Sequence, residues 1–331
     1  MDIGTPAGPL RVVNNVSLKV ARGEAVGLVG ESGSGKSMTA FAAMNLFPSP
    51  QAGLSGGEVW LDGRKISGLP AADMRAVRGA RIGVVFQDPS TYLDPLMPVG
   101  RQIAQTLQAH GKTEGMEQRV LELLELMELP QAAQVARKYP HELSGGMRQR
   151  ILIAAALAMK PALLIADEPT TALDVTVQAG ILRLLVRLRE QLDLGILLIT
   201  HDLAVVAQTC QRVNVMYAGE IIEQQEVEPL FRSPRHPYTQ GLLGSILSPT
   251  SRASELFFIP GTVPMASQWP DGCRFHPRCP IIQPGLCDQR APALLDIGDG
   301  SAGRHRCHRA DEAVARSPWP GLTVAAQARQ A

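Results

Sequence analysis

The fold of this chain is decided by the stretch Gly30-Glu31-Ser32-Gly33-Ser34-Gly35-Lys36-Ser37. An apolar run at residues 25–29 precedes it, and residues 38–44 read as the start of a helix. Strand, glycine-rich loop and helix in this order are the context in which G-x-x-x-x-G-K-S binds nucleotide phosphates. The glycines let successive N–H groups turn toward phosphate oxygens, and the positive end of the helix faces the same place. Lys36 then reaches the β- and γ-phosphates and the Ser37 hydroxyl ligates Mg²⁺, which favours a nucleotide site over a chance glycine-rich turn.

Length and composition exclude several classes of protein. The 331 residues suggest two units, or one unit with a substantial extension, and a hydrophobic share of 45% suffices for a buried core. The net charge of +1 gives no global field for nucleic acid or an anionic membrane. Residues 1–10 lack the features of a secretion signal, and the longest wholly apolar run, residues 151–159, falls far short of the roughly 20 residues that span a bilayer. We therefore expect a soluble protein in a reducing cytosol, where the five cysteines are not read first as disulfides.

Hydrophobic periodicity predicts the order of the elements. Alternating or continuous apolar runs predict strands at residues 10–20, 57–61, 64–66, 81–86, 162–167 and 195–200. Helical spacing predicts helices at residues 103–110, 118–128, 145–159 and 177–192. This order indicates an α/β fold with a mostly parallel sheet, an antiparallel β subdomain and an inserted α-helical subdomain at about 91–159. Beyond residue 231 Pro, Gly, Arg and Cys dominate, so we predict a nucleotide-binding domain at 1–230 and an irregular extension at 231–331.

Two acids close an apolar strand in the stretch Leu163-Leu164-Ile165-Ala166-Asp167-Glu168. A buried strand can hold a carboxylate beside the phosphate loop, where Asp167 would ligate Mg²⁺ directly or support its ligands. Glu168, one step further on, suits a general base or a group that polarises water. Acids after a strand are often only solvated loop residues, but downstream of a phosphate loop the catalytic reading is favoured.

A second helix start follows in Leu143-Ser144-Gly145-Gly146-Met147-Arg148-Gln149-Arg150. Ser144 can cap the helix, and the two glycines leave the first N–H groups uncovered for a phosphate. The chain then has two phosphate-binding helix starts, which are too far apart to close on one nucleotide. This suggests that two chains share their nucleotides. An ordinary helix cap is the alternative, but it does not explain why Gly-Gly, poor for helix stability, occupies the first turn.

Together these motifs resemble the ATP-binding subunit of an ABC transporter. The resemblance spans roughly residues 12–223 and rests on GESGSGKS, LSGGMRQR, LLIADEPT, the loop at residues 172–174 and His201, in that order and spacing. It implies a P-loop ATPase fold of the ABC type, with ATP and Mg²⁺ bound at the phosphate loop.

The resemblance also implies a role for each remaining motif residue. Gln87 would sense Mg²⁺ and contact the membrane subunit, and Asp167 would bind Mg²⁺ through water. Glu168 would polarise the attacking water, and His201 would contact the γ-phosphate. At the dimer interface, Ser144, Gly145 and Gly146 would close on the partner's ATP, and Asp174 would cross to the partner.

The start of the chain departs from that family's pattern. The family usually stacks an aromatic residue on adenine shortly before the strand that contains Val16, and here Leu10 stands nearest. It usually also has a further strand upstream, for which residues 1–9 leave little room. These departures leave the adenine contact unassigned, and they suggest a sequence that begins downstream of its natural start.

The extension resembles the tail of dipeptide/oligopeptide importer ATPases. The residues that carry this likeness are Arg235-His236-Pro237-Tyr238-Thr239, Gly272-Cys273-Arg274-Phe275-His276-Pro277-Arg278-Cys279 and the run at 174–178. The likeness implies a heterodimer with a second, related ATPase. It also implies two permease subunits as direct partners and an extracytoplasmic peptide-binding protein as an indirect one. It places the chain at the cytoplasmic face of the membrane. Peptides are the implied cargo, while nickel chelates and glutathione remain open.

Four of the five cysteines lie in the extension, at positions 273, 279, 287 and 307, whereas Cys210 stands alone and is expected to serve packing. Clustered thiols in a cytosolic protein favour a metal centre over disulfides. The spacing of Cys273, Cys279, Cys287 and Cys307 lacks the close pairs of zinc ribbons, and iron–sulfur clusters tolerate more varied spacing. The resemblance implies a 4Fe–4S cluster, with zinc or four free thiols as the alternatives.

Two other classes of protein fit the sequence less well. A soluble ABC ATPase acting on nucleic acid or ribosomes usually has two cassettes or a long coiled-coil insertion, and it needs a basic stripe for phosphate contact. This chain has one cassette, lacks the coiled-coil insertion and is nearly neutral, so we expect no nucleic-acid partner. A non-hydrolysing regulator is disfavoured because Glu168 and His201 are both present.

Overall fold

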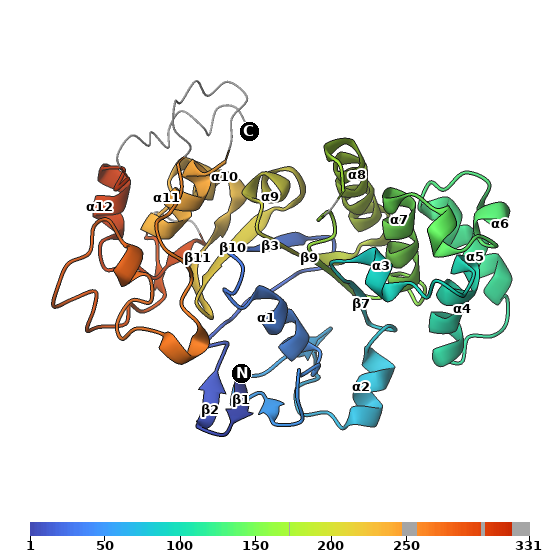
Figure 1. Ribbon diagram of the computed structural model, residues 1–331, viewed down its shortest axis with the longest axis horizontal. Helices are drawn as coiled ribbons and strands as arrows, with labels where there is room; N and C mark the ends of the chain where they lie inside the picture. Colours follow the sequence, from blue (N-terminus) through green and yellow to red (C-terminus); the bar gives the residue numbers. More distant parts are fainter. Residues whose placement is uncertain (172, 247–256, 299–301, 320–331) are drawn as a thin grey trace. The chain divides into compact units, whose positions relative to one another are not determined.

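The chain forms two units in this computed structural model, which describes residues 1–171, 173–246, 257–298 and 302–319 (Figure 1). The first unit comprises Met1–Lys19, Val26–Gly57 and Thr200–Ala331, and the second comprises Val20–Ala25 and Glu58–Ile199. The phosphate loop and the extension belong to the first unit, and the helical subdomain and the acidic strand end belong to the second. The predicted domain boundary near residue 230 stays a prediction.

The strands of the first unit centre on β3 (Ala25–Val29), which is buried along its whole length. β10 (Arg212–Tyr217) runs parallel to β3 and antiparallel to β11 (Glu220–Glu226). The extension then adds two short antiparallel strands, because β13 (Arg304–His305) pairs with both β11 and β12 (Leu295–Asp296). The extension predicted as irregular thus contains short regular elements that join the strands of the first unit.

The helices of the first unit are α1 (Lys36–Ala43), α9 (Leu203–Thr209), α10 (Val227–Arg232), α11 (Pro237–Gly244) and α12 (Ala310–Ala315), with 3₁₀ turns at Ala266–Gln268 and His276–Arg278. α11 begins with Pro237 in its first turn, where a missing N–H costs nothing. The His236 ring caps this helix by accepting a hydrogen bond from the Tyr238 N–H at 3.0 Å. Residues of the RHPYT motif therefore build a helix start.

The first residues of the chain form a small antiparallel sheet, in which β1 (Asp2–Thr5) pairs with β2 (Gly8–Arg11) and with β4 (Ala52–Gly53). The expectation that residues 1–9 leave little room for a strand was wrong. The strand predicted at residues 10–20 was also wrong, because β2 ends at Arg11 and the segment after it joins no ladder. Its carbonyls at Ser17 and Lys19 instead accept hydrogen bonds from the side chains of Gln224 and Arg212.

The second unit contains three parallel strands, β7 (Ile82–Val85), β8 (Leu163–Asp167) and β9 (Gly195–Thr200), paired in that order. β5 (Trp60–Leu61) and β6 (Arg64–Lys65) form the predicted hairpin. The predicted positions of these strands are confirmed. Buried apolar residues fill β8 and β9, as expected for strands covered on both faces.

The helices of the second unit confirm the inserted helical subdomain. They are α2 (Ala71–Val77), α3 (Pro89–Tyr92), α4 (Val99–Ala109), α5 (Met116–Leu126), α6 (Ala132–Val135), α7 (Gly145–Ala156) and α8 (Val175–Leu192), with a 3₁₀ turn at Pro140–Glu142. α8 buries Ile181, Leu184 and Leu188 on one face, at the spacing that the sequence predicted. Among the described residues, every helix is too short or too polar to cross a membrane.

Candidate active site

The phosphate loop connects β3 to α1 with a backbone that requires glycine. Gly30, Gly33 and Gly35 have φ values of +153°, +80° and +103°. A Cβ on Gly30 would lie 2.2 Å from the Met216 carbonyl oxygen. Gly35 caps α1 in the left-handed conformation, so the first N–H groups of the helix face the loop. The predicted strand–loop–helix order is confirmed.

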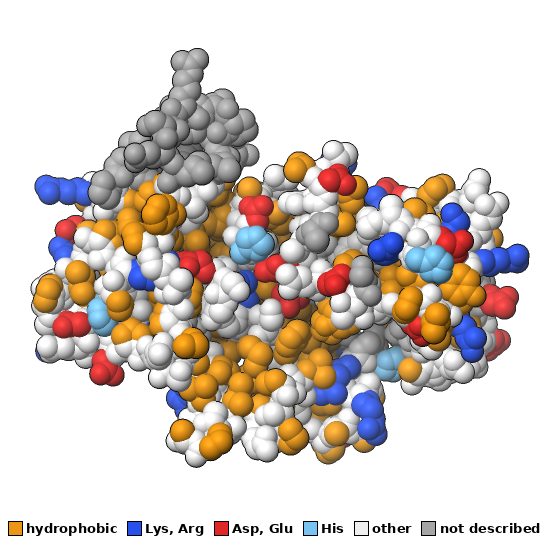
Figure 2. Space-filling model, in the orientation of Figure 1, with side chains coloured by type: hydrophobic (Ala, Val, Ile, Leu, Met, Phe, Trp, Pro, Cys, Tyr) orange, Lys and Arg blue, Asp and Glu red, His pale blue; other side chains and the backbone are white. Residues whose placement is uncertain are grey.

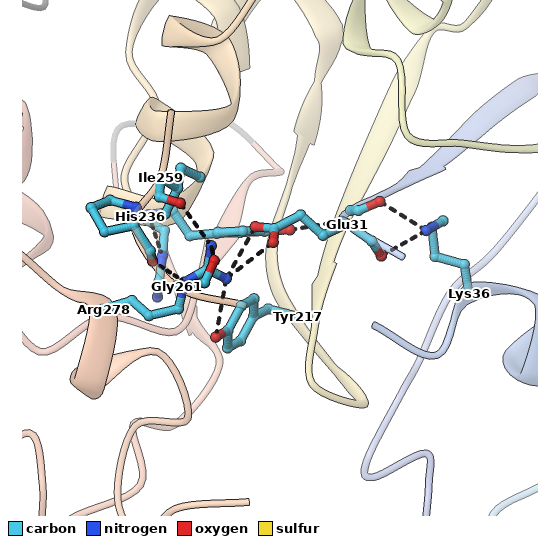
Figure 3. Close-up of polar contacts among 10 residues, drawn as sticks. Glu31, Lys36, Tyr217, His236, Ile259, Gly261 and Arg278 are labelled. Atoms are coloured by element: carbon cyan, nitrogen blue, oxygen red, sulfur yellow. Dashed lines mark hydrogen bonds and ion pairs between the residues drawn. The ribbon is translucent and has the colours of Figure 1, made fainter. Parts of the chain in front are cut away.

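Lys36 lies inside this loop and is only 6% exposed. Its Nζ donates hydrogen bonds to the carbonyl oxygens of Gly30 at 2.8 Å and Glu31 at 2.9 Å (Figure 3). Ser34 is fully buried, and its hydroxyl has no hydrogen-bond partner within the described part of the chain. A buried ammonium and a buried hydroxyl at the start of a helix suit an anionic ligand such as a nucleotide phosphate.

The acidic strand end belongs to the second unit. Asp167 closes β8 and is 6% exposed. Glu168 has a left-handed backbone (φ +47°) and donates its N–H to the Ile199 carbonyl at 2.9 Å. A non-glycine residue in this region is strained, and such strain gathers at functional sites. Glu168 is thereby fixed at the end of a buried strand.

Gln87 meets Glu168, as the parallel pairing of their strands allows. The carboxylate Oε2 of Glu168 accepts hydrogen bonds from Gln87 Nε2 at 3.0 Å and from Thr171 Oγ1 at 2.9 Å. Gln87 is exposed, and it follows the end of β7. The structure therefore brings together two predicted site residues that are 81 positions apart in the chain.

Ser144 begins α7 as predicted, and its hydroxyl accepts a hydrogen bond from the Met147 N–H at 3.4 Å. Ser144 and Gly145 are exposed, whereas Gly146 is buried. A Cβ on Gly146 would lie 2.5 Å from Val177 Cγ1 of α8. Glycine at this position therefore has a packing reason that the sequence did not reveal.

Asp174 and His201 complete the predicted set. The exposed Asp174 caps α8 by accepting the Val177 N–H at 3.0 Å. Ala172, in the same predicted loop, lies outside the described residues. His201 is exposed immediately after β9. The whole phosphate loop and His201 belong to the first unit, whereas Gln87, Asp167, Glu168, the α7 start and Asp174 belong to the second.

The four cysteines of the extension line one cavity of about 20 Å³, together with His236, Phe275 and His308. Cys273 and Cys287 are also joined through their backbones, because the Cys273 N–H donates to the Cys287 carbonyl at 2.8 Å. All five cysteines are free thiols, and Cys210 is buried, as its packing role predicts. The sequence thus correctly grouped four cysteines that span 35 residues.

Burial acts strongly on these thiols. It raises the pKa of Cys273 and Cys307 to about 12 and that of Cys279 to about 11, and the neighbouring thiols add to the rise. Only a strong cation would hold such groups as thiolates. Within the described ranges, no group of three or more His, Cys, Asp or Glu side chains is arranged to hold a metal ion. The cavity has room for about one water molecule, which is smaller than a four-iron cluster.

Sequence reasoning missed the residues that hold Glu31, the second residue of the phosphate loop. Its N–H donates to the Tyr238 hydroxyl at 2.8 Å, and its carboxylate pairs with Arg278 at 3.1 Å (Figure 3). Both partners lie in motifs that the sequence had singled out only by resemblance. A carboxylate inside a phosphate loop was the signal that could have prompted a search for a cation.

Comparison with known families matches two regions of the chain. Residues 13–171 match the family described as ABC transporter, and residues 222–287 match the family described as oligopeptide/dipeptide transporter, C-terminal region. The second match covers the RHPYT motif and three of the four clustered cysteines.

Individual relatives cover nearly the whole chain. A probable peptide ABC transporter ATP-binding protein of Sinorhizobium fredii is 48% identical over 92% of this chain and 91% of its own length. The oligopeptide transport ATP-binding protein OppD of Salmonella typhimurium is 46% identical, over 88% and 87%. Among solved structures, the dimeric ABC transporter cassette MJ0796 covers 68% of this chain and 95% of its own, at 31% identity and a TM-score of 0.59.

Proposed function

The chain belongs to the ATP-binding, ATP-hydrolysing proteins of ABC transporters, in the oligopeptide/dipeptide branch, and we propose that it energises peptide uptake through partner permease subunits. The observation that carries the catalytic part is Glu168, whose strained backbone and two side-chain hydrogen bonds fix a carboxylate at the end of β8. The peptide cargo rests on the extension, where relatives named for peptide transport match this chain.

In the proposed site the phosphate loop holds ATP. Lys36 binds the β- and γ-phosphates, and the loop N–H groups bind the phosphate oxygens between Gly30 and Gly35. The buried position of Lys36 supports this role, because an ammonium in a low-dielectric loop attracts phosphate more strongly than one in water.

Magnesium and water complete the chemistry. Ser37, Gln87 and Asp167 would hold Mg²⁺, because their side chains carry the oxygen atoms that this ion prefers, and Asp167 would act through water. Glu168 then polarises the water that attacks the γ-phosphate, and His201 contacts that phosphate. Support comes from the Gln87–Glu168 hydrogen bond, which links the proposed Mg²⁺ sensor to the proposed base.

The productive assembly is proposed to be a heterodimer with a second, related ATPase. Ser144, Gly145 and Gly146 would close on the partner's ATP, and Asp174 would cross the interface. The exposure of Ser144, Gly145 and Asp174 supports these outward-facing roles. The solved cassette MJ0796, which is described as dimeric, offers a precedent.

We propose that the chain is located at the cytoplasmic face of the membrane, where it binds two permease subunits. An extracytoplasmic peptide-binding protein would deliver the peptide to those permeases. The alternative of a nucleic-acid ATPase has less support. Figure 2 shows Lys and Arg side chains interspersed with Asp and Glu side chains over the described residues of one face, rather than gathered in a basic stripe.

The four clustered cysteines are proposed to hold one metal centre, with an iron–sulfur cluster favoured over zinc. The all-thiol donor set and the shared cavity support a centre, although the cavity would have to open for a four-iron cluster. When bound, the centre would cross-link the extension and substitute for an apolar core.

Co-expression with candidate permeases tests the transport proposal. The chain should fractionate with membranes only when the permeases are present, and the assembled complex should import labelled peptide in an ATP-dependent manner. Import of a nickel chelate or glutathione in place of peptide would change the cargo, and recovery with ribosomes or nucleic acid would overturn transport itself.

Analysis of metal and sulfide in anaerobically purified full-length chain tests the centre. Brown protein with iron and sulfide in proportion supports the cluster. Colourless protein with stoichiometric zinc would replace the cluster with a zinc site. Protein with neither metal and four freely alkylated thiols would remove the proposal.

A further inference from the structure

Each polar group of Glu31 is held by another part of the first unit (Figure 3). Its N–H donates to the Tyr238 hydroxyl, its carbonyl accepts from Lys36 Nζ, and both carboxylate oxygens accept from Arg278 Nη1 at 3.1 Å. Tyr238 and Arg278 belong to the extension and lie 207 and 247 positions further along the chain. The extension therefore fastens the phosphate loop directly.

Arg278 is itself fixed in place. Its Nε donates to the Pro260 carbonyl at 2.7 Å, and its Nη2 donates to the carbonyls of Ile259 and Gly261 at 3.3 and 3.2 Å. The Arg278 side chain is 6% exposed, against 28% for Glu31. A guanidinium is always charged and cannot leave this position without breaking several hydrogen bonds, so it presents a constant positive charge to Glu31.

An aromatic cluster packs around Tyr238, whose hydroxyl contacts Glu31. The rings of Tyr217, Tyr238 and Phe275 meet at centroid distances of 4.7, 5.2 and 5.4 Å. Tyr217 and Tyr238 are almost completely buried. The hydroxyl of Tyr238 is consequently held at the loop by a ring that has little freedom to move.

The charge of Glu31 is a problem for a loop that binds phosphates. An unpaired carboxylate in the partly buried loop would repel the nucleotide, because charges interact more strongly there than in water. We propose that Arg278 is a positioning residue for ATP, which neutralises Glu31 and holds the phosphate loop ready for the nucleotide. This inference rests on the proposed ATP site at Lys36.

A different reading makes Arg278 only an anchor that ties the segment at residues 259–261 to the extension. The two readings predict different results when the charge of Glu31 is removed. If Arg278 acts through charge, removing Glu31 should relieve the loss of Arg278. If Arg278 is only an anchor, the loss of its bonds to backbone carbonyls persists whatever residue stands at position 31.

The test measures equilibrium binding of Mg²⁺-ATP to the full chain. Arg278→Gln should bind ATP roughly tenfold to a hundredfold more weakly than wild type. The double variant Arg278→Gln with Glu31→Gln should return to within about threefold of wild type, because the unpaired carboxylate is gone. Arg278→Lys keeps the charge but loses the fork of donors, and it should also stay within about threefold.

Arg306→Gln is the matched control. Arg306 is a buried arginine of the extension, and it directly precedes a clustered cysteine as Arg278 does. Its side chain donates hydrogen bonds to the carbonyls of Ile221, Pro292 and Asn15. This control should lose thermal stability without losing ATP affinity.

Wild-type affinity in Arg278→Gln, or an equal loss in Arg278→Gln, Arg278→Lys and the double variant, would overturn the inference. If Arg278→Gln does not fold, the result for Arg278→Lys decides, since an anchor predicts a loss there and a charge partner does not. Lys36→Ala separates the two proposals: unchanged ATP binding in that variant would refute the ATP site itself, whereas lost binding beside an unaffected Arg278→Gln refutes only the role of Arg278.

Discussion

The start of α1 and the start of α7 both combine glycine with a helix N-terminus, yet their surroundings differ. At α1 the cap is Gly35 in the left-handed conformation, and Lys36 directly after it is buried. At α7 the cap is the Ser144 hydroxyl, and Ser144 and Gly145 are exposed. The first helix start is partly buried, whereas the second begins with two exposed residues.

The difference shows two uses of the same residue type. In the phosphate loop glycine permits backbone angles that other residues avoid, so that N–H groups converge on a ligand. In α7 the buried Gly146 permits close approach of α8, and this packing leaves the exposed residues before it at the surface. A partly buried helix start suits a ligand bound within one chain, and an outward-facing one suits a ligand held by a partner.

Glu168→Gln should have the largest effect, because it should remove ATP hydrolysis while leaving the helix starts of α1 and α7 intact. The amide keeps the size of the side chain but cannot polarise water, so turnover of the assembled transporter should fall by about 10²–10⁴-fold. ATP affinity should stay within about threefold of wild type. Glu190→Gln, an exposed acid of the same unit, is the control for ATPase assays and should be silent. Turnover near the wild-type rate would show that Glu168 is not the base.

Lys36→Ala breaks the comparison on the side of α1. If the buried Lys36 ammonium binds the phosphates as proposed, its loss should weaken ATP binding to the full chain by on the order of a hundredfold or more. Lys112→Ala, an exposed lysine of the second unit, provides the control. Equilibrium binding of a fluorescent ATP analogue measures both. Equal affinities for the two variants would mean that α1 does not hold the nucleotide.

Ser144→Asp tests the outward-facing start of α7. Aspartate and asparagine both cap helices well, so neither Ser144→Asp nor its matched control Ser144→Asn should lower stability much. The negative charge should repel a partner's ATP and lower hydrolysis by the assembled pair roughly tenfold relative to asparagine. ATP binding to this chain alone should not change. A loss of binding in the isolated chain would contradict the outward-facing role.

The sequence predicted most of this arrangement because its signals are local. The phosphate loop, the strand ends at Gln87 and Glu168, and the cap at Ser144 each depend on a few neighbouring residues. The pairing of Glu31 with Arg278 could not be predicted, because it depends on how 247 positions of chain fold back.

The errors at the N-terminus have a different cause. Residues 16–20 alternate between half-buried and exposed, as a strand does. Two of their carbonyls, however, accept hydrogen bonds from side chains of β10 and β11 instead of pairing with a neighbouring strand. Periodicity reports which side of a segment is buried and not what its backbone pairs with. The two strands within the irregular extension could not be predicted, because β12 and β13 have only two residues each and give no periodic signal.

Gly146→Ala carries the smallest expected effect and separates packing from function at α7. Its new Cβ would lie 2.5 Å from Val177 Cγ1, so α7 and α8 must shift, at a cost of about 1–3 kcal/mol in unfolding free energy. The better helix propensity of alanine would offset up to about 1 kcal/mol of that cost. Gly145→Ala is the matched control, because its Cβ would approach only Leu173 Cδ2, at 3.3 Å. Urea denaturation of both variants and of Gly146→Ala with Val177→Ala measures the effect. Recovery of stability beyond that of Gly146→Ala in the double variant would confirm the clash, since Val177→Ala alone should only destabilise. Equal stabilities for Gly145→Ala and Gly146→Ala would instead mean that close approach of α8 is not the reason for glycine at position 146.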